Sequence, residues 1–562
     1  YDVLVIGGGA TGAGAALDAA TRGLRVALVE REDFASGTSS RSTKLIHGGV
    51  RYLEAALKTF DYKQLRLVLE ALRERQTFIN LAPHLCAPMP IITPCFSYFQ
   101  VAYFWAGLKL YDLFAGSQKL DTCRYLGVRE CERRFPMLAR EGPQGKLRGA
   151  IVYTDGQTND SRMCLGLALT AAAHGADVAN YTNVEQLLVD GDGDGRKVVG
   201  ARVRDELSGD TFDVRAKVVV NATGPFVDAL RQQEQAAAPP LVRPSSGVHV
   251  ILPNYYSPDG LGLIVPKTKD GRVVFMLPWE GKTLAGTTDL ATPLTMRPRA
   301  HTDEVGFILD VLSDYLVVKV RKEDVQAAWA GIRPLAVDPR HAGDSTAKLS
   351  RDHIVDVGPA KMVTVTGGKW TTYRKMAEDV VDTAVRVGEL RHARACDTQR
   401  TPLLGSQHFD GALYAYLAQN FTRFTRGDVH AGAMETDIAQ YLAHSYGSKS
   451  IEVAQLAQHA QLGERLAPKL PFLEAEVIYA CDKEYACKAV DVLARRTRLA
   501  FLDQAAAVSA VPRVVELMGD RLGWSAARRA AEHADALAFL DTMRSSPSPR
   551  DGSTKLRCGK FC

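Results

Sequence analysis

The sequence contains no Cys-x-x-Cys pair and no group of histidines and cysteines at zinc-binding spacing, although it has 562 residues and ten cysteines. This pattern indicates free thiols in a reducing compartment and predicts no metal site. One acidic loop, from Asp190 to Gly195, resembles the start of a calcium-binding EF-hand. Its twelfth position is Ala201, where a bidentate glutamate is required. We interpret this loop as a solvated turn between two strands.

The sequence also lacks a long apolar run and a concentrated basic patch. No helical stretch of about 20 apolar residues occurs, so we expect no membrane-spanning helix. Lys and Arg number 69 against 64 Asp and Glu, and the small surplus is spread along the chain. A nucleic-acid partner is therefore not expected. The mild positive charge fits an anionic small substrate or an acidic membrane surface.

A G-x-G-x-x-G motif follows an apolar strand near the start of the chain and opens a helix. Its glycines permit a tight turn, a close approach of the backbone to a pyrophosphate, and close packing of helix on strand. The helix N-terminus favours the negative charge of the phosphates. An acidic residue ends the next strand, where it can accept a hydrogen bond from a ribose hydroxyl. We predict a dinucleotide site formed by Gly7, Gly9, Ala10, Thr11, Gly12 and Glu30.

The choice between FAD and a nicotinamide cofactor depends on a second segment. Residues 221–225 read Asn-Ala-Thr-Gly-Pro after a run of three valines, a turn that is typical of FAD-binding proteins. No second G-x-G-x-x-G motif is present to hold a nicotinamide. We therefore predict FAD, bound in an extended form, with hydride arriving from the substrate.

The segment from Thr38 to Glu54 closely resembles the signature of the FAD-dependent glycerol-3-phosphate dehydrogenases. Further matches to that family occur in the same order along the chain, through about residue 540. They are Asp155-Gly-Gln, Asp160-Ser-Arg162, Gly247-Val-His-Val250, Gly286-Thr-Thr-Asp289, Gly331-Ile-Arg-Pro-Leu335, Ser350-Arg-Asp352, Thr366-Gly-Gly-Lys-Trp-Thr-Thr-Tyr-Arg374 and Ala494-Arg-Arg-Thr-Arg-Leu-Ala-Phe501.

The resemblance implies an α/β plus α fold, with a Rossmann-like FAD-binding domain, an antiparallel-sheet cap and a C-terminal all-helical domain. The expected boundaries are 1–84, 145–240 and 331–390 for the FAD-binding domain, 85–144 for a membrane-associating or cap insertion, 241–330 for the cap sheet, 400–545 for the helical domain and 546–562 for a disordered tail.

The same resemblance implies the activity and its partners. The family oxidises sn-glycerol 3-phosphate to dihydroxyacetone phosphate and passes electrons from reduced FAD to a quinone such as ubiquinone. It implies monotopic attachment to the mitochondrial inner membrane or to a bacterial-type cytoplasmic membrane, and it is compatible with a homodimer. Some mitochondrial relatives carry C-terminal EF-hands, which this sequence lacks, so calcium activation is not carried over.

Candidate substrate residues stand within the matched motifs. Arginine meets phosphate oxygens bidentately, and Arg51, Arg333 and Arg351 could hold phosphate or polarise the reacting oxygen. His249, on an expected strand, is the favoured proton acceptor, with His47 as the alternative. Ordinary packing remains an alternative for each of these residues. Tyr52 is a further substrate-binding candidate, and Lys369 should stabilise negative charge on the reduced flavin.

The remaining predicted cofactor contacts lie in the motif segments beyond the first glycine turn. They are Thr38, Ser39, Ser40, Thr43, His47, Gly48, Gly49, Val184, Ala222, Thr223, Gly224, Gly368, Lys369, Trp370 and Thr371.

The segment 88–116 combines early prolines with eight aromatic residues, and no charge occurs from 85 to 108. Aromatic rings are at home at the headgroup level of a membrane. We interpret the segment as one that dips into a leaflet near the path of the quinone, with packing under the helical domain as the alternative.

Two other functions fit part of the pattern. A soluble glycerophosphate oxidase would share the first half-reaction and use oxygen as its acceptor. A non-catalytic FAD-binding scaffold would keep the glycine motif and Glu30 but would not need the three arginines, His249 and Lys369 together.

Overall fold

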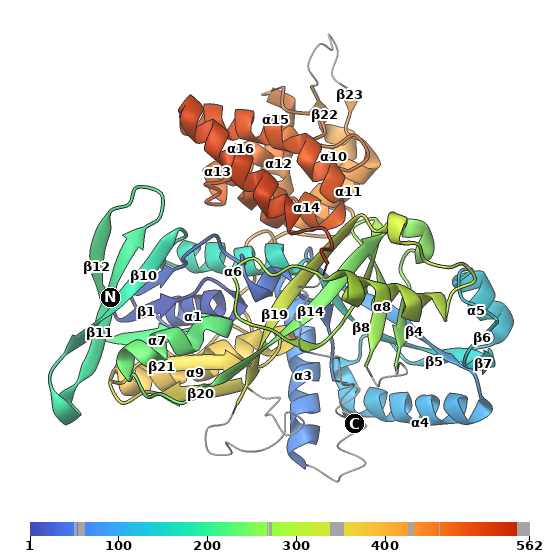
Figure 1. Ribbon diagram of the computed structural model, residues 1–562, viewed down its shortest axis with the longest axis horizontal. Helices are drawn as coiled ribbons and strands as arrows, with labels where there is room; N and C mark the ends of the chain where they lie inside the picture. Colours follow the sequence, from blue (N-terminus) through green and yellow to red (C-terminus); the bar gives the residue numbers. More distant parts are fainter. Residues whose placement is uncertain are drawn as a thin grey trace.

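The computed structural model describes residues 1–49, 53, 62–266, 268, 272–337, 353–424, 432–459 and 461–547. It consists of a six-stranded sheet, a ten-stranded sheet and a C-terminal helical domain above both (Figure 1). The expected fold class, an α/β protein with an added helical domain, is confirmed.

The six-stranded sheet is built on β1 (Val3–Ile6), a fully buried strand. Parallel neighbours pair with β1 on both sides, and only β20 runs antiparallel. The strand order is β20 (His353–Val357), β21 (Val363–Gly367), β13 (Val218–Asn221), β1, β2 (Val26–Val29) and β9 (Asp177–Ala179). Helices α1 (Ala10–Thr21), α6 (Asp160–Ala173) and α9 (Tyr373–Val387) cover one face through a shared apolar cluster. Such parallel strands place their carboxyl ends at one edge, where ligands bind.

A smaller sheet covers the other face. Apolar residues of β1, β2 and β13 pack there against an antiparallel sheet and against α7 (Val227–Glu234). This sheet comprises β10 (Thr182–Asp190), β11 (Lys197–Asp205) and β12 (Thr211–Arg215), and it projects to the left in Figure 1. The acidic loop at 190–195 is the turn between β10 and β11, as expected.

The ten-stranded sheet is mainly antiparallel, with one parallel pair between β15 and β4. Its main order is β18 (Leu290–Ala291), β14 (Val242–Leu252), β17 (Lys282–Gly286), β16 (Val274–Trp279), β15 (Gly262–Val265), β4 (Cys86–Cys95), β8 (Gly149–Thr158) and β3 (Leu45–Ile46). β19 (Ala327–Ala336) pairs with β14, and β5 (Arg124–Leu126) pairs with β8. Helices α5 (Val128–Arg134) and α8 (Thr302–Ser313) pack against one face of this sheet.

Some strands belong to a different sheet from the one that the expected domain boundaries imply. β4 comes from the segment expected to be a membrane-associating or cap insertion, and it pairs with β8 of the ten-stranded sheet over ten positions. β8 and the end of β19 also belong to the ten-stranded sheet rather than to the cofactor-binding sheet. The prolines of β4 misled the prediction because Pro88, Pro90 and Pro94 look like strand breakers, whereas this strand keeps a regular register around them.

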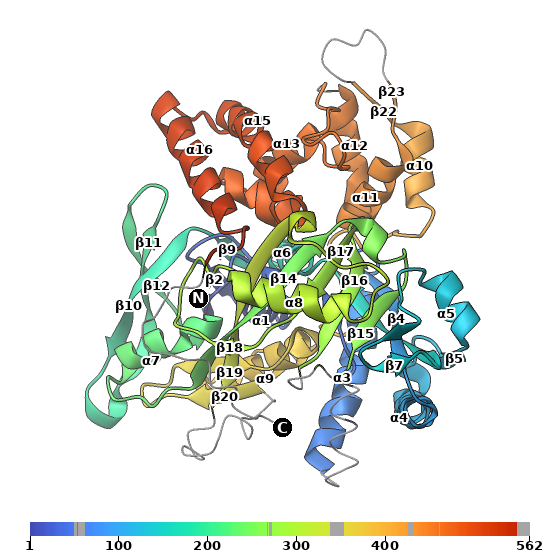
Figure 2. The ribbon, with the colours of Figure 1, turned by 45° about the vertical axis from the view of Figure 1, so that its right-hand side comes forward.

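The C-terminal domain packs its helices around a large apolar core. It contains α10 (Leu413–Asn420), α11 (Thr436–Tyr446), α12 (Ser450–His459), α13 (Glu474–Lys483), the π-turn η11 (Asp491–Arg496), α14 (Leu499–Leu502), α15 (Gln504–Leu522) and α16 (Ala526–Asp541). The two-residue strands β22 (Thr422–Arg423) and β23 (Gly432–Ala433) form a hairpin where no strand was expected. Figure 2 shows the domain above the ten-stranded sheet, and residues from β16, β17 and β19 enter its core.

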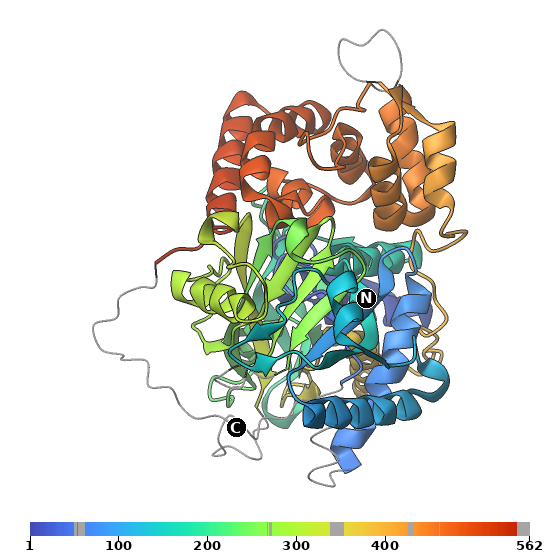
Figure 3. The same cartoon turned by 90° about the vertical axis from the view of Figure 1, so that its right-hand side faces the viewer.

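Two helices, α3 (Tyr62–Leu81) and α4 (Tyr98–Ala115), lie together on the side away from the helical domain (Figure 3). α4 is the aromatic half of the segment expected to meet a membrane. Among the described residues, no helix combines the length and apolar character needed to cross a bilayer. Beyond residue 547, the expected disordered tail lies outside the described residues.

Candidate functional site

The glycine motif forms a tight turn at the carboxyl end of β1. Gly7 has a φ of +108°, and a Cβ there would lie 2.7 Å from the carbonyl oxygen of Ala222. A Cβ on Gly12 would lie only 1.9 Å from the carbonyl oxygen of Gly7. Larger residues therefore do not fit at either position. The turn after β13, which contains Ala222, closes against this loop.

The N-terminus of α1 opens onto this turn. Gly9 is its N-cap residue, so no side chain caps the helix, and the first turn has no acidic residue. The Ala10 N–H donates to Ser39 Oγ at 2.9 Å. Glu30, at the end of β2, accepts from the Gly8 N–H at 2.6 Å. A glycine-lined, uncapped helix N-terminus beside a carboxylate fits the pyrophosphate and ribose of FAD.

A second glycine turn brings the segment after β21 to Ser39, beside the N-terminus of α1. Gly367 and Gly368 have φ values of +81° and +69°, and Lys369 then precedes the short helix η9 (Trp370–Thr372). The Trp370 indole N–H donates to the Ser39 carbonyl at 2.9 Å. Two predicted cofactor segments that are far apart in the sequence are therefore in direct contact.

His249 and Arg333 lie on one face of the β14–β19 pair. The register sets His249 opposite Trp329 and Ser245 opposite Arg333, and alternate residues of a strand share a face. A Cβ on Gly247, between them, would lie 2.2 Å from the Arg333 guanidinium. Glycine at this position therefore makes room for the guanidinium.

The His249 ring is buried and held on two sides. Its Nε2 lies 2.9 Å from Thr43 Oγ1, and the ring stacks on Trp329 with centroids 5.6 Å apart. Its Nδ1 has no hydrogen-bond partner among the residues that the structure describes. Burial lowers the pKa of His249 well below its ordinary value, and the positive charges of Lys44 and Arg333 lower it further. The ring is therefore neutral, which is the form that a proton acceptor requires.

The Arg333 guanidinium is partly exposed and bonded mainly to neutral oxygens. It donates to the Ser246 carbonyl at 3.2 Å and to Thr287 Oγ1 at 3.0 Å. Its contact with Asp289 Oδ1 is long, at 3.4 Å. Within the described part of the chain, no close ion pair neutralises its charge, so it remains available to an anionic ligand.

Lys44 is a fully buried cation that the sequence analysis did not single out. Its Nζ donates to Asp160 Oδ2 at 2.7 Å and to the Ser40 carbonyl at 2.8 Å. Arg498, from the helical domain, donates to the same Ser40 carbonyl at 2.7 Å. Burial lowers the pKa of Lys44 to about 7, against the opposing effect of Asp160. The matched motifs contain all of these residues, but only the fold shows that they meet.

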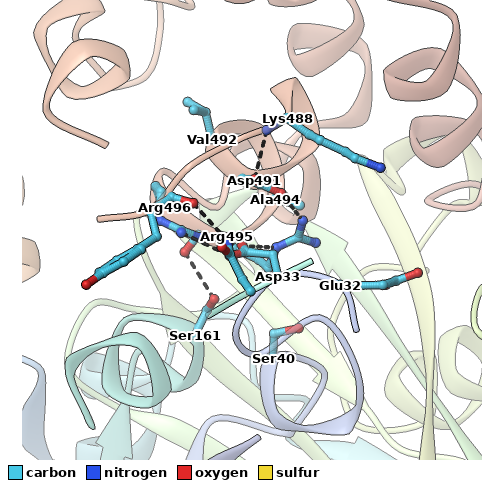
Figure 4. Close-up of polar contacts among 12 residues, drawn as sticks. Glu32, Asp33, Ser40, Ser161, Lys488, Asp491, Val492, Ala494, Arg495 and Arg496 are labelled. Atoms are coloured by element: carbon cyan, nitrogen blue, oxygen red, sulfur yellow. Dashed lines mark hydrogen bonds and ion pairs between the residues drawn. The ribbon is translucent and has the colours of Figure 1, made fainter. Parts of the chain in front are cut away.

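A second buried cluster joins the helical domain to the nucleotide segment (Figure 4). Arg495 and Arg496, in η11, both donate to the carboxylate of Asp33, which follows β2. Arg495 also bonds to Asp491, and Ser161 Oγ donates to the Arg495 carbonyl at 3.0 Å. The two arginines hold the pKa of Asp33 below its usual range despite its burial. A charged pair of this kind fixes the helical domain over the cofactor segment.

Not every predicted site residue can be placed. Arg51, Tyr52 and Arg351 lie outside the described residues. Thr38 is placed, and its hydroxyl donates to the Ile332 carbonyl at 2.6 Å, which ties the nucleotide segment to β19. Val184 lies on β10 in the apolar cluster that contains Ile6 and Val29, at the edge of the nucleotide site.

Comparison with known proteins gives a consistent result over nearly the whole chain. The family described as FAD dependent oxidoreductase matches residues 2–374, and the C-terminal domain of alpha-glycerophosphate oxidase matches residues 396–529. The chain is 55% identical over 548 residues to the mitochondrial glycerol-3-phosphate dehydrogenase of Arabidopsis thaliana, covering 97% of this chain and 86% of that protein.

A human protein and a solved bacterial structure are also similar to nearly the whole chain. The mitochondrial glycerol-3-phosphate dehydrogenase of Homo sapiens is 49% identical over 549 residues, covering 96% of this chain and 73% of that protein. The crystal structure of the glycerol-3-phosphate dehydrogenase from Bacillus halodurans, complexed with FAD, superposes with a TM-score of 0.75 at 28% identity. That match covers 96% of this chain and 95% of the bacterial chain.

Proposed function

Because the chain belongs to the FAD-dependent oxidoreductases, and among them to the glycerol-3-phosphate dehydrogenase family, we propose that it oxidises sn-glycerol 3-phosphate to dihydroxyacetone phosphate with FAD. The observation that carries the proposal is the shared face of β14 and β19. A neutral histidine, His249, and an available arginine, Arg333, lie together on that face.

Each residue of this face has a separate task in the proposed reaction. Arg333 binds the phosphate of the substrate through charge-assisted hydrogen bonds. His249 takes the proton of the C2 hydroxyl through an imidazole nitrogen, which is neutral because burial disfavours the imidazolium. Bound FAD supplies the hydride acceptor. Lys369, which follows the second glycine turn, supplies positive charge on the flavin side of the site. Arg51, Tyr52 and Arg351 complete the proposed substrate site.

The proposed electron acceptor is a membrane quinone, ubiquinone or a relative of it. α4 supports this part of the proposal because it presents large apolar side chains to solvent on its outer face. The exposed fractions are 71% for Tyr98, 77% for Phe99, 40% for Tyr103, 46% for Trp105, 37% for Leu110 and 72% for Leu113. A contiguous surface of this kind marks an interaction site, and aromatic rings suit a headgroup layer. We place α4 in one leaflet, as a peripheral contact.

The proposed location follows from the relatives. The curated proteins with about half of their residues identical are named as mitochondrial enzymes. Together with the apolar outer face of α4, this supports peripheral attachment to the mitochondrial inner membrane. A homodimer is compatible with this arrangement.

Anaerobic reduction of the flavin tests the central proposal. Purified holoenzyme mixed with sn-glycerol 3-phosphate in the absence of oxygen should lose its yellow absorbance. Glycerol, which lacks the phosphate for Arg333, is the matched control and should leave the colour unchanged. Persistent flavin absorbance with the phosphorylated substrate would contradict the proposal.

A second assay separates the two possible acceptors. The reduced enzyme is mixed either with oxygen or with a soluble quinone analogue. Rapid reoxidation by the quinone and slow reoxidation by oxygen are expected of the dehydrogenase. The opposite order would identify a glycerophosphate oxidase.

A further inference from the structure

One peptide group, between His47 and Gly48, is held at both of its ends. Its N–H, from Gly48, donates to Asp155 Oδ1 at 3.1 Å. Its carbonyl oxygen, from His47, accepts from Thr371 Oγ1 at 3.2 Å. Asp155 lies on β8 of the ten-stranded sheet, whereas Thr371 follows β21 of the six-stranded sheet. The two sheets therefore clamp this peptide between them.

The Asp155 side of the clamp is a closed network of buried groups. Asp155 Oδ1 also accepts from Arg75 Nη1 at 2.7 Å and from the Tyr111 hydroxyl at 3.0 Å. Arg75 Nη1 also lies 3.1 Å from the Tyr111 oxygen, so each member contacts the other two. The exposed fractions are 2% for Asp155, 1% for Arg75 and 2% for Tyr111. Hydrogen bonds in such a dry setting orient their partners strongly.

Tyr111 brings α4 into direct contact with this loop. It is one of three buried residues of the helix, with Leu108 and Ala115, on the side opposite the exposed aromatic face. A Cβ on Gly48 would lie 2.0 Å from the Tyr111 hydroxyl, so the hydroxyl rests on the glycine backbone. Burial and the nearby Asp155 carboxylate raise the pKa of Tyr111 well above its usual value. The hydroxyl therefore keeps its proton and donates.

We propose that Tyr111 and Asp155 are positioning residues that orient the His47–Gly48 peptide beside the flavin, so that α4 helps to set the geometry of the cofactor site. The inference rests on the proposed function, since it assumes FAD at the His47–Gly49 loop. It assigns α4 a second role on its inner face, distinct from the docking role of its outer face. Neither residue contacts the substrate in this scheme.

Tyr111→Phe removes the hydroxyl and keeps the ring, so it tests the proposal with little disturbance of packing. In the holoenzyme we expect an altered flavin absorption spectrum and a shifted flavin midpoint potential. Flavin reduction by glycerol 3-phosphate should slow by roughly three- to tenfold, the usual effect of one hydrogen bond, with KM near the wild-type value. Hydrogen exchange of the Gly48 amide, measured by mass spectrometry, should become faster.

Tyr416→Phe, at an exposed position of α10 in the helical domain, is the matched control and should change none of these quantities. If Tyr111→Phe lowers only the melting temperature and leaves spectrum, potential and exchange unchanged, the positioning role is wrong. The exchange measurement needs no cofactor, so a rapidly exchanging Gly48 amide in the wild type would also overturn the clamp. Failure of substrate to bleach the wild-type flavin would instead overturn the proposed function.

Should Tyr111→Phe not fold, Thr371→Val tests the other end of the same peptide. It removes the donor to the His47 carbonyl and should likewise speed exchange of the 45–49 segment. Unchanged exchange in that variant would show that the peptide is not clamped.

Discussion

His249 combines burial, a hydroxyl partner and an unbonded ring nitrogen, and these properties define its expected role. His249→Gln should retain FAD, because the residue is separate from the glycine turns. It should slow flavin reduction by roughly 10²- to 10⁴-fold, the usual contribution of a general base. Single-turnover stopped flow measures this directly. Near-normal reduction in a fully flavinated variant would transfer the role to His47 or to water.

Arg333 is expected to act on binding of the substrate phosphate. Arg333→Ala should lower kcat/KM for glycerol 3-phosphate by roughly 30- to 150-fold, because one charge-assisted contact of about 2–3 kcal/mol is lost. Arg243 is the matched control, since it lies on β14 but is exposed to solvent. Arg243→Ala should leave kcat/KM unchanged. Equal kcat/KM values in the Arg333 and Arg243 variants would show that Arg333 does not bind the substrate phosphate.

His84 gives the protein a predictable sensitivity to acid. It is buried against Gly405 and Gly447, and burial, Arg162 and His444 lower its pKa to about 3. In the unfolded chain its pKa returns to about 6.5. Between these values the unfolded chain binds a proton that the folded protein does not. The contribution of neutral His84 to the free energy of unfolding is therefore fully present above about pH 6.5. It is lost as the pH falls toward 3.

The corresponding measurement is the free energy of unfolding by urea as a function of pH. His84→Gln should reduce the acid slope by up to about 1.4 kcal/mol per pH unit, the value for one proton. His174→Gln, at an exposed position, should leave the slope as it is. An unchanged slope in the His84 variant would show that other groups account for the acid sensitivity.

At the scale of elements, α4 buries Leu108, Tyr111 and Ala115 on one face and exposes large apolar side chains on the other. The proposed membrane contact is restricted to the outer face of this helix. β4 is excluded because it is a sheet strand, and Phe104 of α4 is excluded because it packs against the sheet core. Replacing Phe99, Trp105 and Leu113 with Ser should release the enzyme from vesicles in a flotation assay. Quinone reduction should fall while flavin reduction by substrate is retained.

The control for this variant carries three serines at exposed rings far from α4. Phe212, Tyr255 and Tyr416 are 51%, 54% and 48% exposed, so they too are large apolar side chains open to solvent. This control should bind vesicles like the wild type. If both triple variants bind equally well, the membrane surface lies elsewhere on the molecule.

At the scale of the whole molecule, Asp33 holds the helical domain on the nucleotide segment. Asp33→Ala leaves Arg495 and Arg496 buried without their main carboxylate, and breaking such a pair costs about 3–5 kcal/mol. We expect a lower urea midpoint and faster proteolysis between the domains. The exposed pair of Arg202 and Asp213 provides the control, since Asp213→Ala should leave the urea midpoint close to the wild-type value. Similar losses in both variants would show that the Asp33 cluster does not hold the domains together.

The sequence alone determined the features that depend on neighbours along the chain. The glycine turn at residues 7–12, the alternation of strands and helices, FAD and the family could all be predicted from short motifs, because each turn requires its own residues locally. His249 and Arg333 were found in the same way, and the structure brings them to one face.

Only the tertiary structure decided which distant groups meet. β4 is a sheet strand because β8 and β15 supply its partners, although its prolines indicated otherwise. The buried Lys44–Asp160 pair and the contact of Tyr111 with Gly48 left no periodic signal in the sequence. Such contacts join segments that are far apart along the chain, and their energies depend on burial. Burial is a property of the packed molecule rather than of any single segment.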